Sequence, residues 1–588
     1  MTTYSAPVTD MQFVQQELAG LNEIATLPGF EEASTELVET VLEEASRLAG
    51  EVLTPLNRVG DTEGARVEGD RVLLPDGFGE AYSELTEGGW LSLVHNPEYG
   101  GQGLPQVVSM SVEEMWNSAN LSLSLCPLLT KGAIEAIEAH AEAPLKDTYL
   151  PMLISGEWSA TMNLTEPQAG SDLAAVRTEA TREGGHYRIR GQKIYITWGE
   201  HELTENIIHL VLARLPDAPP GVGGISLFLV PKYLPNEDGS PGERNDLKVV
   251  SIEHKLGINA SPTCVMSFGE GEGALGYLVG EENRGLACMF TMMNDARIGV
   301  GVQGLALCER AYQQAVAYAK DRVQGNLPGE PERVAIIKHA DVRRMLMVMK
   351  AQTEACRAVA YASAAAADYF KHHAEADARA LNRSRLDLLT PIVKGWCTEV
   401  SQEVTSLGIQ VHGGMGFVEE TGAAQYYRDA RITTIYEGTT GIQAGDLVGR
   451  KVMRDGGEAM QALLAEMADC AAEGGFGWED ALSQAIKQLA EATQWLLAHG
   501  ADDVHSPGAA SFNFLMLAGT VVGGWQMARS AQAARRLIDS GSDNAGFYNA
   551  KIATARFYAD HLLSRAAAYQ AAATVGSAST MALSDEQF

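Results

Sequence analysis

The spacing of hydrophobic positions changes twice along the chain. From about residue 31 to residue 153, apolar side chains recur every three or four residues, as at Leu37, Val41 and Leu48. This is the spacing of an amphipathic helix that buries one face. The first part of the chain is therefore predicted to be a helical domain, assigned to residues 1–155.

The spacing becomes strand-like near Trp158. Tyr187 and Ile189 alternate with polar residues, and residues 207–213 and 225–230 are short apolar runs bounded by Pro and Gly. Such runs indicate buried strands. A β domain over residues 156–280 is the expected second domain.

Helical spacing returns after Gly285. Long Ala-rich segments are expected over residues 285–322, 333–369 and 386–410. A further helical region runs from about residue 456 towards the end of the chain, with Gly-rich breaks at 474–477 and near Gly541, and the final residues read as a loose tail.

The order of these segments sets the fold class. Strands do not alternate with helices, so a doubly wound parallel sheet is excluded and an α+β fold is expected. The third domain is a helical bundle over residues 281–455, and residues 456–588 form an additional helical domain.

The composition of the chain argues against several classes of binding partner and site. The net charge of −32 argues against a nucleic-acid partner and against an anionic membrane surface. The 7 cysteines stand singly, which argues against a disulfide scaffold and against a metal site of zinc type. The first residues have neither a basic region nor an apolar run, and no stretch reaches the length of a membrane helix. A reducing, cytoplasmic setting is expected.

Two short motifs suggest other classes of enzyme. Gly299, Gly301 and Gly304 match a dinucleotide-binding pattern, but they lie inside a predicted helix with no strand before them. Close packing between helices accounts for such small residues equally well. His412 begins a His-Gly-Gly sequence like that of a lipase, yet the chain has no GxSxG nucleophile motif.

Three segments carry more specific chemistry. Residues 164–172 (LTEPQAGSD) combine hydroxyls with a turn that can direct backbone N–H groups at a phosphate. Residues 191–197 (GQKIYIT) form a strand ending in an aromatic and a hydroxyl. Residues 426–440 (YYRDARITTIYEGTT) place Glu437 in an apolar context. Taken alone, these could be a turn, a strand and a helix cap.

Together and in this order, the three segments resemble the signatures of the acyl-CoA dehydrogenase family. The resemblance covers roughly residues 30–455, and residues 254–257, 278–285 and 409–414 fit it too. It implies FAD as cofactor and Glu437 as catalytic base. Tyr195 and Trp198 depart from the family, which often has Trp and Asn at these positions.

The resemblance also implies binding residues. The residues expected to contact FAD are Met162, Leu164, Thr165, Gly170, Ser171, Tyr195, Thr197, Arg322, Gln410, Gly414 and Thr439. Among these, Arg322, Gln410 and Gly414 would reach FAD in a neighbouring subunit, which implies a homodimer or homotetramer. Ser171, Arg297 and Gly438 are expected at the acyl-CoA substrate, with no metal. An ion pair between helices is the other interpretation of Arg297.

The implied reaction is α,β-dehydrogenation of an acyl-CoA thioester to the 2-enoyl-CoA, with electron-transfer flavoprotein as acceptor. The domain after residue 456 is typical of large family members. The amino-acid sequence of residues 426–440 most resembles one branch of the family. That branch converts 3-methylmercaptopropionyl-CoA to methylthioacryloyl-CoA in dimethylsulfoniopropionate breakdown. A generic medium- or long-chain acyl-CoA dehydrogenase, an acyl-CoA oxidase and a non-catalytic acyl-CoA-binding scaffold are the alternatives.

Overall fold

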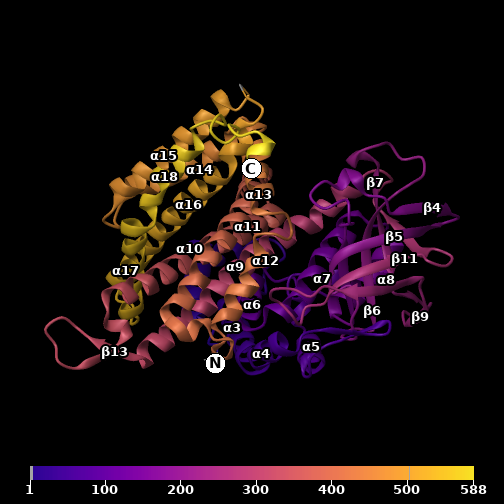
Figure 1. Ribbon diagram of the computed structural model, residues 1–588, viewed down its shortest axis with the longest axis horizontal. Coiled ribbons are helices and arrows are strands. Elements are labelled where there is room, and N and C mark those ends of the chain that lie inside the picture. Colours follow the sequence, from indigo (N-terminus) through magenta and orange to yellow (C-terminus); the bar gives the residue numbers. More distant parts are fainter. Residues whose placement is uncertain (1–3, 502) are drawn as a thin grey trace. The chain divides into compact units, whose positions relative to one another are not determined.

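The computed structural model describes residues 4–501 and 503–588, which divide into two compact units (Figure 1). The helical unit comprises Met1–Ser46, Pro105–Ser118 and Arg297–Phe588. The sheet unit comprises Arg47–Leu104 and Ala119–Ala296. Neither unit is a single stretch of sequence, so residues far apart in the chain meet within each one.

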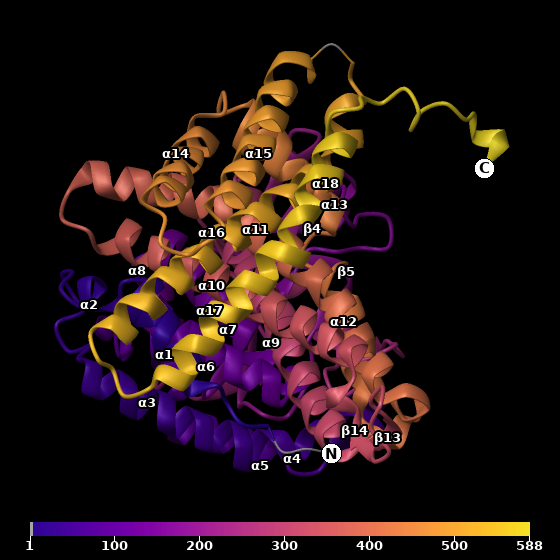
Figure 2. The ribbon, with the colours of Figure 1, turned by 90° about the vertical axis from the view of Figure 1, so that its left-hand side faces the viewer.

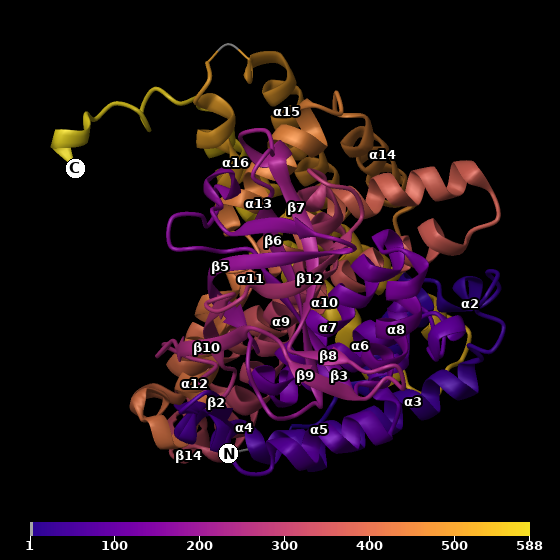
Figure 3. The same cartoon turned by 90° about the vertical axis from the view of Figure 1, so that its right-hand side faces the viewer.

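The sheet unit is built on an eight-stranded sheet (Figure 3). Its main path runs β10-β11-β5-β12-β7-β6-β3, and β4 pairs with β5 and β6. Pairing is antiparallel except where β6 meets β3 and β4. The strands after the first helical segment are β3 (Trp158–Asn163), β4 (Glu179–Glu183), β5 (His186–Thr197), β6 (Asn206–Arg214), β7 (Ile225–Pro231), β8 (Tyr233–Pro235), β9 (Pro241–Arg244), β10 (Leu247–Ile252), β11 (Thr263–Phe268) and β12 (Ala274–Val279).

The central strands are buried on both faces because successive side chains enter two different cores. On β6, Leu210 and Leu212 belong to one hydrophobic cluster, whereas Val211 and Ala213 belong to the other. The first cluster includes side chains of α7 and α8. This explains why residues 207–213 are apolar except for His209, and the expected β fold of this segment is confirmed.

Helices flank the strands within the sheet unit. They are α4 (Thr54–Glu63), α5 (Phe78–Glu87), α7 (Leu121–His140) and α8 (Ala143–Ser155). A small hairpin of β1 (Arg66–Glu68) and β2 (Arg71–Leu73) interrupts this helical region. The uniform helical interpretation of residues 31–153 was wrong there, because the hairpin is too short to produce a visible alternation.

Long helices dominate the helical unit (Figures 1 and 2). α9 (Gly285–Asp321) starts in the sheet unit's sequence and continues into the helical unit at Arg297. The others are α1 (Val8–Phe13), α2 (Leu21–Ile24), α3 (Thr35–Leu48), α6 (Gln106–Ala119), α10 (Ala340–His372), α11 (Ala376–His412), α12 (Ala423–Thr433), α13 (Thr440–Asp446), α14 (Glu458–Glu473), α15 (Glu479–His499), α16 (Ser506–Asp539), α17 (Ala545–His561) and α18 (Ala566–Ala573).

Two details differ from the sequence expectation. Arg333–Ala335 is strand β14, which pairs with β13 (Val323–Asn326), so the helix expected from residue 333 begins only at Ala340. A further break separates α15 from α16, where the sequence lacks a Gly cluster. The break at 474–477 and the extended C-terminal tail agree with expectation, and the tail extends away from α18 (Figure 2).

The glycines of the dinucleotide-like motif serve helix packing. A Cβ atom on Gly301 would lie 2.7 Å from the carbonyl oxygen of Val393, and one on Gly304 would lie 2.8 Å from that of Cys397. Both glycines are inside α9, so the residues directly before them are helical and not a strand. The pattern therefore lets α9 approach α11 closely and does not form a phosphate-binding turn.

A buried ion network joins the start of the chain to its last domain. The Arg357 guanidinium on α10 is 1% exposed and contacts Asp10 at 2.6 Å, Glu114 at 2.6 Å and Glu309 at 2.7 Å. Lys551 on α17 contacts Asp10 at 2.6 Å and Glu354 at 2.8 Å.

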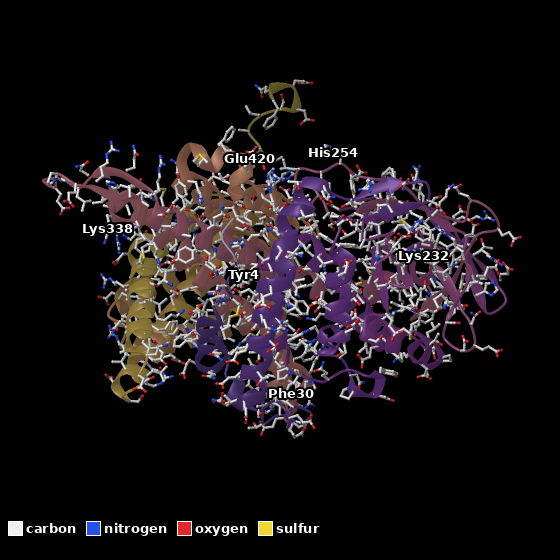
Figure 4. The ribbon with its side chains drawn as sticks, turned by 90° about the horizontal axis from the view of Figure 1, so that it is seen from below. Tyr4, Phe30, Lys232, His254, Lys338 and Glu420 are labelled. Atoms are coloured by element: carbon white, nitrogen blue, oxygen red, sulfur yellow. The ribbon has the colours of Figure 1, made fainter. Side chains whose placement is uncertain are left out.

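Burial alone would raise the pKa of Asp10, but Lys551 and Arg357 hold that pKa below its usual range. Tyr4 is buried among the helices (Figure 4), and the backbone of the exposed Ser5 exchanges hydrogen bonds with the Gln313 side chain. We refer to Asp10, Glu114, Glu309, Glu354, Arg357 and Lys551 as the buried ion network.

All seven cysteines are free thiols and buried. In the described part of the chain, no group of His, Cys, Asp and Glu side chains has the arrangement of a metal site. Among the same residues, no helix combines the length and hydropathy that crossing a membrane requires.

Candidate active site

Glu437 lies in a strained turn between two helices of the helical unit. α12 ends at Thr433 and α13 begins at Thr440. Glu437 has φ 54° and Gly438 has φ 86°, both in the left-handed region. A side chain in this region costs conformational energy and persists only where its surroundings impose it. Such strain is a feature of functional turns.

Buried side chains from two helices impose this conformation. Gln443 on α13 donates from Nε2 to the carbonyl oxygen of Glu437 at 3.1 Å. Lys394 on α11 donates from Nζ to the carbonyl oxygen of Gly438 at 2.6 Å. Both side chains are fully buried. The two successive carbonyls are therefore fixed from different sides.

The capping role belongs to Thr439 and not to Glu437. The Thr439 hydroxyl accepts a hydrogen bond from the N–H of Ile442 at 3.2 Å, which caps α13. Within residues 4–501 and 503–588, no group hydrogen-bonds the Glu437 carboxylate, and the N–H of Glu437 is also without a partner. The carboxylate and this N–H are thus available to a ligand.

The surroundings of Glu437 favour its protonated form. The residue is only partly exposed, and burial of the carboxylate raises its pKa to about 7, with Lys394 and Arg297 partly opposing the rise. Burial also lowers the pKa of Lys394 to about 8, an effect that Glu437 opposes. A carboxylate whose pKa lies near neutrality suits general base catalysis.

Arg297 is buried beside this turn. Its Nη1 lies 3.6 Å from the Asp446 carboxylate, so the expected alternative, an ion pair between helices, is present. Burial lowers the pKa of Arg297, while Asp446 and Glu437 raise it. Arg297, Glu437, Gly438 and Thr439 therefore meet within the helical unit.

In the sheet unit, the 164–172 loop is pinned to β5 by a buried ion pair. Lys193 Nζ lies 2.8 Å from Glu166 Oε1 and donates to the Leu164 carbonyl at 3.0 Å. Burial would raise the pKa of Glu166, but Lys193, Thr178 and the Arg177 N–H bring it to about 2. The ionised pair fixes the loop against the strand.

The strand end carries two residues with unusual backbones. Tyr195 has φ 59° and lies at a register shift between β5 and β11. Tyr195 is 60% exposed. Trp198 has φ 54° but is buried, and its indole N–H donates to the Ser122 carbonyl at 3.2 Å. Asn, which the family often has at position 198, tolerates this conformation better than Trp does. The strain at Tyr195 turns a large aromatic ring outwards.

The remaining predicted residues of the sheet unit surround this loop and strand. The N–H of Ile194 donates to the Thr165 carbonyl at 2.9 Å, which brings the loop and β5 together. Gly170 and Ser171 are exposed at the turn of the loop. The half-buried residues of the set are Met162, Leu164, Thr165 and Thr197.

Arg322, Gln410 and Gly414 form a second group, in the helical unit. The rings of Tyr318 and His412 stack at 4.5 Å between centroids, which joins the ends of α9 and α11. Arg322 directly follows α9, and Gln410 is near the end of α11, so they share this end of the helix pair. All three predicted residues are exposed.

The sequence analysis did not identify the side chains that restrain the Glu437–Gly438 turn and the 164–172 loop. Lys394 interrupts a buried run, Leu388–Cys397, in which it is the only charged residue, and that isolation was a usable signal. Gln443 and Lys193 carry no comparable signal, because their partners become evident only from the folded contacts.

The chain resembles known proteins over most of its length. Four family models match: "Acyl-CoA dehydrogenase, N-terminal domain" over residues 35–157, its "middle domain" over 161–270, its "C-terminal domain" over 283–452, and "Acetyl-CoA dehydrogenase C-terminal like" over 460–584. Together they extend over both units and the additional helical domain.

Individual relatives agree. The 3-methylmercaptopropionyl-CoA dehydrogenase of Ruegeria pomeroyi is 51% identical, over 95% of this chain and 96% of that one. A broad-specificity linear acyl-CoA dehydrogenase of Mycobacterium tuberculosis is 35% identical, over 96% of each chain. The structure of a Bacillus anthracis acyl-CoA dehydrogenase complexed with FAD matches with a TM-score of 0.73 at 21% identity, over 93% of this chain and 89% of that one.

Fold and relatives together define an oxidoreductase built from helical and β segments. The chain belongs to the acyl-CoA dehydrogenase family. The expected family, fold class and enzyme class are confirmed.

Proposed function

We propose that the protein is an FAD-dependent dehydrogenase that converts 3-methylmercaptopropionyl-CoA to methylthioacryloyl-CoA, with Glu437 as the catalytic base. The observation that carries the proposal is the Glu437 carboxylate, which is free of hydrogen bonds and has a pKa raised by burial to about 7. A carboxylate in this state accepts a proton readily near neutral pH.

The reaction removes two hydrogens from adjacent carbons. Glu437 takes the proton from the α-carbon, and the α,β double bond forms as a hydride leaves the β-carbon. Bound FAD supplies the acceptor for that hydride. The free N–H of Glu437 donates to the thioester oxygen and stabilises the negative charge that develops there.

The residues of the sheet unit fit a flavin. The outward Tyr195 ring offers an aromatic face, and the hydroxyls of Thr165 and Thr197 are accessible donors. Exposed Gly170 and Ser171 suit a phosphate, because Gly lets the backbone approach closely. Met162 and Leu164 supply apolar contacts beside them.

The second group completes the cofactor site from another subunit. Arg322, Gln410 and Gly414 would contact FAD bound to a partner, in a homodimer or homotetramer. Met415, Phe417 and Val418 are exposed next to Gly414, and a contiguous exposed apolar patch of this kind supports a subunit contact. The Arg297–Asp446 pair favours support of the base over direct contact with CoA.

The proposed substrate is based on the sequence identity to two relatives of different specificity. The chain is 51% identical to a 3-methylmercaptopropionyl-CoA dehydrogenase and 35% identical to a broad-specificity linear acyl-CoA dehydrogenase. We propose electron-transfer flavoprotein as acceptor, as in the family. The negatively charged chain, with its reduced thiols, suits a cytoplasmic enzyme.

The test is a comparison of substrates on the purified protein. We expect kcat/KM for 3-methylmercaptopropionyl-CoA to exceed that for butyryl-CoA and octanoyl-CoA by at least about tenfold, since a pocket discriminates side chains of different size by such factors. The free acids should not react, because only the thioester acidifies the α-proton. The first substrate should bleach the flavin absorbance.

Three outcomes would contradict parts of the proposal. A preference for octanoyl-CoA would assign a long-chain enzyme. Hydrogen peroxide formed at the rate of turnover would assign an oxidase. Absence of flavin bleaching by any acyl-CoA would leave only a binding role.

The pH dependence provides a separate prediction. Below its pKa the Glu437 carboxyl is protonated and cannot accept the α-proton, so kcat/KM should rise with pH and level off above about pH 7. On the acidic side it should fall about tenfold per pH unit. The measurement is kcat/KM from about pH 5.5 to about pH 9, with preincubation controls for inactivation. A profile that is flat across this range would count against Glu437.

A further inference from the structure

Lys394 is a buried cation that the reaction itself does not use. It lies on α11 with its side chain fully buried, within a stretch of apolar residues. An ammonium group removed from water is costly unless nearby groups compensate it. Its hydrogen-bond acceptor is the Gly438 carbonyl at 2.6 Å, a neutral group. Burial lowers the pKa of Lys394 to about 8, so at neutral pH and below a positive charge lies beside the turn that carries Glu437.

The charges around Glu437 come from several elements. α9 contributes Arg297, and α13 contributes Asp446, which pairs with Arg297 at 3.6 Å and with Arg450 at 3.5 Å. α12 contributes Asp429, which lies near the Tyr436 hydroxyl.

α11 contributes Glu399 as well as Lys394. Glu399 accepts a hydrogen bond from the Thr440 hydroxyl at 2.6 Å. Arg297 thus has its own carboxylate partner, whereas the partner of Lys394 is a carbonyl. Both cations lower the pKa of Glu437, and the effect of Lys394 is larger than that of Arg297.

The contact also has a geometric consequence. The Gly438 carbonyl is held from α11 and the Glu437 carbonyl from α13, and these helices pack against each other (Figure 2). Two successive left-handed residues would relax towards other conformations without such restraint. The direction of the Glu437 side chain and of its free N–H depends on this pair of hydrogen bonds.

We infer that Lys394 is a positioning residue, which holds the Glu437–Gly438 turn in its reactive conformation and keeps the Glu437 carboxylate in its ionised, proton-accepting form. The inference rests on the proposed role of Glu437 as the base. It assigns two separable effects to one side chain: a hydrogen bond that sets geometry, and a charge that favours the carboxylate.

Two substitutions separate these effects. Lys394→Met removes both the donor and the charge while keeping the length of the side chain. Lys394→Gln removes the charge but retains an N–H donor. The hydrogen-bond acceptor of Lys394 is a neutral carbonyl, so its exchange for an apolar side chain of similar volume leaves no hydrogen-bonded carboxylate without its partner. Lys451→Met is the matched control, because it removes an ammonium that pairs instead with Asp387 at 3.6 Å.

The readout is the pH profile of kcat/KM with flavin content and thermal stability measured on the same samples. The acidic limb is the part of the profile in which kcat/KM rises with pH. In both Lys394 variants this limb should shift to higher pH by about one unit, because loss of a nearby opposite charge raises the pKa of a carboxyl by this order. The plateau at high pH, where Glu437 is ionised in every variant, should fall at least about tenfold in Lys394→Met and less in Lys394→Gln. Lys451→Met should keep the wild-type limb and plateau.

The outcomes distinguish this inference from the proposed function. If Lys394→Met binds flavin normally and keeps both limb and plateau, Lys394 has no positioning role. If its stability falls while the limb stays in place, its role is structural and the inference is likewise overturned. If Lys394→Met cannot be purified, an unshifted limb in Lys394→Gln overturns the inference in the same way. If Glu437→Gln retains activity, the proposed base itself is wrong, whatever the Lys394 variants do.

Discussion

Glu437→Gln is expected to lower turnover by about 100- to 10,000-fold, the usual contribution of a general base. The substitution is nearly isosteric and keeps the backbone of the strained turn, so FAD content and thermal stability should stay at wild-type levels. The amide cannot accept the α-proton at any pH, which means that alkaline conditions should not restore activity. The measurement is single-turnover flavin reduction by 3-methylmercaptopropionyl-CoA.

The control for this experiment is Glu473→Gln. Glu473 is an exposed carboxylate at the end of α14, so the same chemical change there should leave flavin reduction unaffected. Flavin reduction by Glu437→Gln within a few-fold of the wild-type rate would show that another group takes the proton.

Arg357→Met is expected to destabilise the helical unit by about 3–5 kcal/mol, the range for removing one partner from a buried ion pair. The guanidinium contacts three carboxylates of the buried ion network, and its loss leaves Glu114 and Glu309 buried near each other without their cation. The melting temperature should fall by about 5–10 °C. Differential scanning fluorimetry with circular dichroism at 222 nm checks this.

Arg344→Met provides the matched control on the same helix. The Arg344 side chain is 49% exposed and pairs at the surface with Asp341, so its loss should change stability by less than about 1 kcal/mol. Equal melting temperatures for the two variants would mean that the buried ion network contributes no more than a surface pair.

The local patterns of the sequence predicted most of the fold. Residues 207–213 and 225–230 are strands because apolar residues fill both faces of a covered sheet, and α9 continues through Gly299–Gly304 because small residues let it pack against α11. The β1–β2 hairpin and the strand at Arg333–Ala335 escaped notice. Each of these strands is only three residues long, so an alternation of apolar and polar residues cannot be recognised in it.

The candidate site was predictable where its residues are contiguous in sequence. Glu437, Gly438 and Thr439 are neighbours, and their family resemblance identified them together. The partners that restrain them are remote: Lys394 reaches Gly438 across 44 positions, and Lys193 reaches Glu166 across 27. Such pairs depend on how helices and strands pack, and no rule of local spacing describes that.

The contact between Asp10 and Lys551 bears on how the chain is made. The two residues are 541 positions apart, so Asp10 leaves the ribosome long before Lys551 is synthesised. At about 5–20 residues per second, the wait lasts on the order of 30–110 s. Until Arg357 emerges, 347 positions after Asp10, this carboxylate has no cation of the buried ion network beside it. A chain that stops before α17 retains the pair between Asp10 and Arg357 but lacks Lys551, so one cation instead of two holds its N-terminal segment. Synthesis of α17 thereby supplies the second of the two cations that hold the Asp10 carboxylate in the interior.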